Sequence, residues 1–292
     1  MAHNRLPIVL AHGIARFDNL REIAVRKLGI PQAELGDRLH YFKRIKSSLE
    51  AHGFTVFHTS VDFAGSVDLR AKQLSDQIKS ILNERDFDQV HIIAHSMGGL
   101  DARHMIVDID GMAERVASLT TIGTPHLGTS IADLGMRLGG ELITTILKSV
   151  INLEGFQDLT TIACERFNRR AQEQEASNTV VYRTYASAEN RDAVVLPLQA
   201  SWLIISRTEG ENDGLVSVKS QHWTKELIGT SGQRKPVEQW RFPIPADHLN
   251  EVGWGDLQAT NPLGGLLQAE KQTDAYEQKI RSIYVQIAES LS

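Results

Sequence analysis

The stretch from Val90 to Leu100, VHIIAHSMGGL, constrains the fold of this chain more than any other part of the sequence. The apolar run from Val90 to Ala94 is typical of a buried strand, and the residues after Gly98 have the pattern of a helix. Ser96 therefore stands at a turn between a strand and a helix. Such a turn is so tight that the residues two before and two after the serine must be small, and both are.

This junction has the form of a nucleophile elbow, in which a strained turn holds the serine hydroxyl out above a sheet. The usual pattern is G-x-S-x-G; here Ala94 makes it A-x-S-x-G, which adds one methyl group. A serine–glycine loop between a strand and a helix could show the same letters by chance. The flanking segments, with an acid and a histidine following in the expected order, favour Ser96 as a nucleophile.

Length and composition limit the class of protein. The chain has 292 residues, a net charge of −5 and one cysteine, Cys164. This length suits one large domain, and a single cysteine allows neither an internal disulfide nor a cysteine metal cluster. The negative charge, without a basic cluster, argues against nucleic acid as a partner. We expect no signal peptide in MAHNRLPIVLAHG and no transmembrane helix, which makes the cytoplasm the default location.

Predicted strands and helices alternate through the first half of the chain. Strands are expected at residues 8–11, 54–61, 90–94 and 116–122, and helices near 39–49, 74–82 and 98–107. This order predicts an α/β fold with a mostly parallel sheet flanked by helices. Later strands are expected at 179–185, 202–205 and 237–242. A closing helix carries one apolar stripe, made of Tyr276, Ile280, Ile283 and Ile287.

A serine hydroxyl needs a histidine to accept its proton and a carboxylate to orient that histidine. After an elbow serine the acid precedes the histidine in the chain. His248 follows the last predicted strand, where a loop can reach across the sheet, although a surface histidine in a turn would look the same. Asp213 lies between Ser96 and His248 and is expected after the end of a strand, in an Asn-Asp-Gly stretch that is also a common turn. Asp192 and Asp247 are the alternative acids.

The negative oxygen of a tetrahedral intermediate needs backbone N–H donors. Met97, the residue after the nucleophile, is expected to supply one of them. The second is expected from Ile14, because Gly13 allows a close approach of the backbone after the first strand. The side chain of Ile14 would then face the acyl pocket.

Five segments carry a family resemblance: PIVLAHGI, AHSMGG, TIGTPHLGTS, ENDGLVS and DHLNEV, in this order over residues 7–253. Together with SVDLRAKQL they resemble the bacterial true lipases of the α/β-hydrolase fold, and most closely the subfamily without a disulfide. The resemblance implies a triad of Ser96, Asp213 and His248 and an oxyanion hole of Ile14 and Met97. It also implies a lipid or other acyl-ester substrate, and a lipid–water interface as a possible binding partner. Export without a leader is known in that family.

The resemblance departs at the structural calcium site of those lipases. The family's aspartate two residues after the catalytic histidine is replaced by Asn250, and near the second expected aspartate only Asp192 is found. Calcium prefers several oxygen ligands with carboxylate charge. We therefore expect no cofactor and no tightly bound metal.

Residues 130–161 are apolar, contain glycines and show no strand signal. An ordinary crossover helix with a loose end would explain them. We favour a helical cap or lid over residues 130–170 of a single domain, 1–292, because the segment follows a strand end. Leu142 and Ile146 are the side chains expected to face an acyl chain. Other apolar residues of the segment are Leu134, Met136, Leu138, Ile143, Leu147, Val150 and Ile151.

The leading functional hypothesis is a serine-dependent carboxylic-ester hydrolase, first of all a triacylglycerol lipase. A short-chain carboxylesterase, a thioesterase or an acyltransferase could use the same triad. A hydrolase-like binding module without catalysis is the remaining alternative, and an intact serine, aspartate and histidine set argues against it. Labelling with a fluorophosphonate separates the last alternative from the others, because a binding module should not react.

Overall fold

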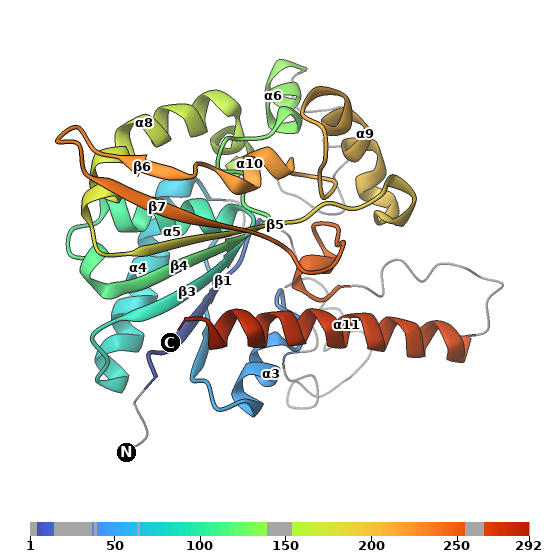
Figure 1. The fold of residues 1–292 in the computed structure, drawn as a ribbon, viewed down its shortest axis with the longest axis horizontal. Helices are drawn as coiled ribbons and strands as arrows, with labels where there is room; N and C mark the ends of the chain where they lie inside the picture. Colours follow the sequence, from blue (N-terminus) through green and yellow to red (C-terminus); the bar gives the residue numbers. More distant parts are fainter. Residues whose placement is uncertain are drawn as a thin grey trace.

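The computed structural model describes residues 5–14, 37, 40–62, 65–138, 154–254 and 266–291. Within these residues one seven-stranded sheet has the order β2-β1-β3-β4-β5-β7-β6 (Figure 1). Neighbouring strands are parallel, except that β6 pairs antiparallel with β7. The bounds are β1 Ile8–Ala11, β2 Val56–His58, β3 Val90–His95, β4 Val116–Ile122, β5 Val181–Ala186, β6 Glu226–Ile228 and β7 Arg234–Arg241.

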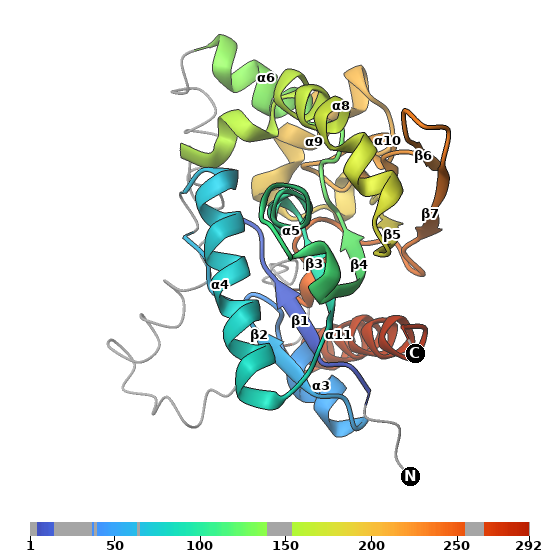
Figure 2. The same cartoon turned by 90° about the vertical axis from the view of Figure 1, so that its left-hand side faces the viewer.

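Helices cover both faces of this sheet. Figure 2 shows α4 and α5 on one side and α3 and α11 on the other. The bounds are α3 Ile45–Ala51, α4 Val67–Arg85, α5 Met97–Asp108, α6 Ser130–Arg137, α8 Thr161–Ser177, α9 Gln199–Thr208, α10 Val218–His222 and α11 Leu266–Glu289. Short 3-10 helices are η1 Ala113–Arg115, η2 Glu154–Leu159, η3 Arg191–Ala193, η4 Leu196–Leu198 and η5 Asn250–Val252. The predicted α/β architecture is confirmed.

Strand β1 shows why the sheet is buried on both faces. Its four side chains are all buried, and successive side chains of a strand point to opposite faces. Ile8 and Leu10 join the apolar cluster that contains α3 and α11, whereas Val9 and Ala11 join the cluster of α4 and α5. A strand that is buried on both faces has apolar residues at every position, so it appears in the sequence as a continuous apolar run.

One strand prediction is wrong. Residues 202–205, expected to form a strand, lie in helix α9. The four-residue run WLII is too short for its period to separate a strand from a buried helix. The helix buries Ser201 and Ile205, which are four residues apart on one face. The antiparallel edge strand β6 was not predicted either.

The segment between β4 and β5 contains α6, η2 and α8. Residues 139–153 lie outside the described part, so the expectations for Leu142 and Ile146 fall there. On α6, Met136 is 56% exposed, whereas Ile131 is buried. Among the described residues, no helix is long and apolar enough to cross a membrane.

Candidate active site

Ser96 occupies the predicted turn between β3 and α5. Its backbone has φ 57° and ψ −136°, a conformation that costs a non-glycine residue about 1–3 kcal/mol. Gly98 is required for the turn, because a Cβ atom there would lie 2.5 Å from the carbonyl oxygen of Ala11. Ala94 is fully buried in the apolar cluster of α4 and α5, so its methyl group packs in the core.

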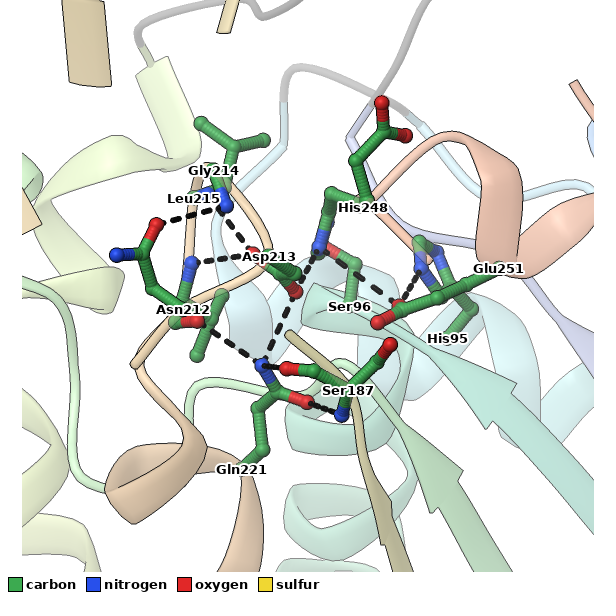
Figure 3. A network of polar contacts seen from close by, with 12 residues as sticks. His95, Ser96, Ser187, Asn212, Asp213, Gly214, Leu215, Gln221, His248 and Glu251 are labelled. Atoms are coloured by element: carbon green, nitrogen blue, oxygen red, sulfur yellow. Dashed lines mark hydrogen bonds and ion pairs between the residues drawn. The ribbon is translucent and has the colours of Figure 1, made fainter. Parts of the chain in front are cut away.

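Three side chains from separate parts of the chain meet at this turn (Figure 3). The Nε2 atom of His248 lies 2.8 Å from Ser96 Oγ, and its Nδ1 atom lies 2.8 Å from Asp213 Oδ2. Ser96 is 7% exposed, His248 4% and Asp213 0%. The structure therefore brings the predicted serine, histidine and aspartate into one hydrogen-bonded chain, at distances suited to proton transfer.

Asp213 lies in a turn between α9 and α10, and not directly after a strand as expected from the sequence. Its Oδ1 atom accepts the backbone N–H groups of Leu215 and Val216, at 2.8 and 2.7 Å. Gly214, at φ 100°, gives the turn the conformation that this requires. Local backbone donors therefore fix one oxygen of the carboxylate and leave the other for His248.

The two alternative acids have other positions. Asp192 is exposed in η3. Asp247 is buried, and its Oδ1 atom accepts the backbone N–H groups of Leu249 and Asn250. Its Oδ2 atom accepts the N–H of Val195 at 2.8 Å. Asp247 thus ties the loop that carries His248 to the segment after η3.

The residues expected to form an oxyanion hole flank the serine. Met97 is the first residue of α5, where backbone N–H groups have no acceptor within the helix and favour an anion. Ile14 lines the same pocket as Ser96. A Cβ atom on Gly13 would lie 2.7 Å from Ser96 Cβ, so this close approach needs glycine.

The loop after β1 is held by a buried ion pair that the sequence did not reveal. Arg70 is 0% exposed and forms a salt bridge with Asp101, with 2.6 Å between Nη2 and Oδ2. The same Nη2 atom donates to the backbone oxygen of His12 at 2.9 Å. A buried, hydrogen-bonded guanidinium is costly to leave unpaired, so this link fixes the backbone that leads to Ile14.

A second polar network, also missed from the sequence, adjoins His248. His95 Nε2 lies 2.8 Å from Glu251 Oε2, and His95 Nδ1 lies 2.6 Å from the hydroxyl of Tyr41. Burial, followed by the charge of Asp213, raises the pKa of Glu251 well above its usual range. Burial also lowers the pKa of His95. Burial therefore favours the uncharged form of both groups. Glu251 Oε2 also lies 3.9 Å from His248 Nδ1.

A pocket lined mainly by apolar side chains opens onto Ser96 and His248. Its wall includes Ile131 of α6 and Phe156 and Leu159 of η2, all from the segment between β4 and β5. The pocket therefore suits an apolar group held beside the serine.

The structure shows the surroundings of the residues at the family's calcium position. Asn250 is buried, Asp192 is exposed, and the oxygens of Asp247 accept backbone N–H groups. In the described part of the chain, two groups of acidic and histidine side chains have ligand atoms close enough together to hold one ion. Neither group includes Asp192 or Asp247. Both oxygens of Asp247 are thus engaged by backbone donors, whereas calcium prefers carboxylate oxygens directed at the ion.

Comparisons with known proteins agree with the fold. Residues 7–162 match the family described as PGAP1-like alpha/beta domain. A protein named triacylglycerol lipase 2, from Saccharomyces cerevisiae, is 31% identical over 222 residues; the match covers 74% of this chain but only 63% of the yeast protein. A triacylglycerol lipase from Pseudomonas fragi is 25% identical, and the match covers 89% of this chain and 93% of that lipase. A metagenomic carboxyl esterase shares the fold, with a TM-score of 0.64 at 16% identity, covering 99% of this chain and 77% of that one.

Proposed function

The chain belongs to the family of the PGAP1-like alpha/beta domain and has the α/β-hydrolase fold, and from this premise we propose that it is a serine-dependent carboxylic-ester hydrolase. The observation that carries the proposal is the hydrogen-bonded chain from Ser96 through His248 to Asp213 beside an apolar pocket. Triacylglycerol is the substrate class that we favour, because the yeast and Pseudomonas relatives bear the name triacylglycerol lipase.

In the proposed mechanism, Ser96 Oγ attacks the ester carbonyl while His248 Nε2 takes its proton. The carboxylate of Asp213 holds the proton of His248 on Nδ1 and stabilises the imidazolium. The N–H groups of Met97 and Ile14 receive the oxyanion. His248 then protonates the leaving alcohol. In the second half of the reaction, His248 takes a proton from water as the water attacks the acyl carbonyl, and it returns a proton to Ser96 Oγ as the acid is released.

Two finer assignments belong to the proposal. We place the chain with the lipases that lack a disulfide, because Cys164 is its only cysteine and is buried as a free thiol. We also propose that residues 130–170 act as a cap, because Ile131 and Phe156 of this segment line the pocket beside Ser96. A cap of this kind would exclude water from the acyl-enzyme.

Hydrolysis of a graded series of p-nitrophenyl esters and of emulsified triacylglycerol tests the proposal. A short-chain esterase would hydrolyse the acetyl ester and leave the emulsion intact. A thioesterase or an acyltransferase would prefer a thioester or an added alcohol acceptor. Fluorophosphonate labelling is the parallel measurement: a protein that neither reacts with the probe nor hydrolyses any ester is a binding module, and the proposal fails.

Narrowing the pocket should change the preference for acyl chain length. Ile131→Trp places a larger side chain at the pocket wall, so long-chain esters should lose much more kcat/KM than acetyl esters. Each methylene excluded from the pocket forgoes about 0.8 kcal/mol of burial as an upper bound. Ile162→Trp, at a position that is 59% exposed on α8, is the matched control and should leave the preference unchanged. An equal loss on all chain lengths would contradict the assigned acyl pocket.

Removing calcium should have no effect on the protein. A cation that binds only the folded state stabilises it by RT ln(1 + [L]/Kd), so a true site would shift the melting temperature with calcium concentration. Because Asn250 and the engaged Asp247 leave no carboxylate pair for the ion, we expect EDTA to change neither the melting temperature nor the activity. A rise of several degrees on adding calcium would disprove this expectation.

A further inference from the structure

Gln221 in α10 is 1% exposed, and its carboxamide reaches the carboxylate of Asp213 (Figure 3). Its Nε2 atom lies 3.2 Å from Asp213 Oδ2, 3.0 Å from the backbone oxygen of Ser187 and 2.9 Å from that of Val216. Its Oε1 atom accepts the backbone N–H of Ser187 at 2.7 Å. Every polar atom of this side chain is therefore engaged inside the protein.

The surroundings fix the orientation of the amide. The nitrogen end faces three acceptors, and the oxygen end faces one donor, the N–H of Ser187. A rotated amide would place its oxygen against three other oxygens and its nitrogen against an N–H group, which leaves all of them unpaired. The two N–H hydrogens of Gln221 therefore face all three acceptors, and Asp213 Oδ2, at 3.2 Å, shares one of these hydrogens with a backbone oxygen.

These contacts join the separate segments that build the site. Ser187 directly follows β5, and its hydroxyl donates to the backbone oxygen of Ala246, two residues before His248, at 2.8 Å. Val216 belongs to the turn that carries Asp213. The carboxamide of Gln221 thus links the end of the sheet and the turn of the acid, while Ser187 extends the link to the loop of the histidine.

We propose that Gln221 is a positioning residue for the catalytic acid: its Nε2–H holds Asp213 Oδ2 in line with His248 Nδ1. The proposal rests on the function proposed above and deepens it. Asp213 is fully buried, and a buried carboxylate needs hydrogen-bond donors to remain ionised. Leu215 and Val216 supply donors to Oδ1, and Gln221 shares Oδ2 with His248. A donor on each side of Oδ2 keeps the carboxylate from rotating away from the imidazole.

The variant Gln221→Glu tests this role through the pH profile. It replaces the donating nitrogen by an oxygen of nearly the same size, facing Asp213 and two backbone oxygens. Burial and the nearby carboxylate should raise the pKa of the new carboxyl well above the ordinary value of about 4.3. While protonated, it donates one hydrogen and retains activity. As pH rises through its pKa it becomes charged, faces Asp213, and kcat should fall. Among the described residues, His248 contacts Asp213 at 2.8 Å, and the charge of Asp213 also acts on Glu251, which lies 3.9 Å from His248 Nδ1.

The expected profiles differ in shape. Relative to the wild-type profile, Gln221→Glu should add a descending alkaline limb. Gln221→Met, which has no donor and no charge, should lower kcat by roughly 10–100-fold at every pH, since hydrogen bonds to charged groups contribute about 1.5–3 kcal/mol. KM should stay unchanged in both variants, because Gln221 does not belong to the wall of the apolar pocket.

Gln239→Glu is the matched control. Gln239 lies on strand β7, and its amide donates to the backbone oxygen of His222 in α10 rather than to Asp213. The same chemical change there should leave the pH profile unaltered. Melting curves are recorded for each variant. An active wild type with unchanged kcat and pH profile in both Gln221 variants would overturn the proposal, as would loss of folding in both. An inactive wild type would instead contradict the proposed function itself.

Discussion

Ester hydrolysis should fall about 10⁶-fold in kcat when Ser96 is replaced by alanine, the scale found when a triad nucleophile is removed. Ser96 Oγ is the atom that His248 Nε2 contacts at 2.8 Å, and alanine offers no nucleophile in its place. The remaining rate, roughly 10³–10⁴-fold over water, would come from the oxyanion donors and binding alone. The measurements are the hydrolysis of a p-nitrophenyl ester, which should show no burst phase, and labelling by a fluorophosphonate, which should be absent.

The strained backbone at Ser96 supplies a control for folding. Alanine retains the Cβ atom and hence the strain of φ 57°, whereas glycine adopts this conformation without that cost. Ser96→Gly should therefore be as inactive as Ser96→Ala but more stable, by about 1 kcal/mol or more in the free energy of unfolding. Urea unfolding of both variants measures this difference. Wild-type turnover in a clean preparation of either variant would remove Ser96 from the mechanism.

The parts of the fold that the sequence predicted depend on short-range rules. The turn at Ser96 was recognisable because its steric demands fall on residues two positions away, and the run from Val90 to Ala94 is long enough to read as a strand. Helix α11 was predicted from its apolar stripe, which contains Ile280 and Ile283. The prediction of a strand at residues 202–205 failed, because the period of a four-residue apolar run does not distinguish a strand from a helix.

Asp213 shows how chain order can identify a residue even when the local argument is wrong. We expected it after a strand, but the preceding element is α9. Its place between Ser96 and His248 was the better guide, because that order reflects how the parallel strands bring their carboxyl ends to one edge of the sheet.

The supporting residues could not be predicted, because their roles arise from contacts between distant segments. Arg70 reaches the oxygen of His12 across 58 positions, and His95 reaches Glu251 across 156. No spacing rule relates such pairs. Gln221 likewise had no signal, since a glutamine in a short polar helix normally lies on a solvated face.

Replacing Asp213 by asparagine should lower kcat about 10⁴-fold, less than the loss of Ser96. Leu215 and Val216 donate N–H groups to Oδ1, so the asparagine oxygen will take that place and its NH₂ will face His248. An NH₂ group can only donate, so it favours the tautomer of His248 that carries its proton on Nε2. That tautomer cannot accept the proton of Ser96, because the accepting lone pair now lies on the wrong nitrogen.

Glu251→Gln is the matched control for this prediction, because Glu251 is the other carboxyl close to His248 Nδ1, at 3.9 Å rather than 2.8 Å. Burial and the charge of Asp213 raise the pKa of Glu251 and so favour its uncharged form, and an uncharged amide of the same shape should retain most of the activity. The double variant Ser96→Ala with Asp213→Asn should be little worse than Ser96→Ala alone, because the three residues act as a unit. If Glu251→Gln lost activity about 10⁴-fold while Asp213→Asn kept it, Glu251 would be the acid and the contact at 2.8 Å would be structural.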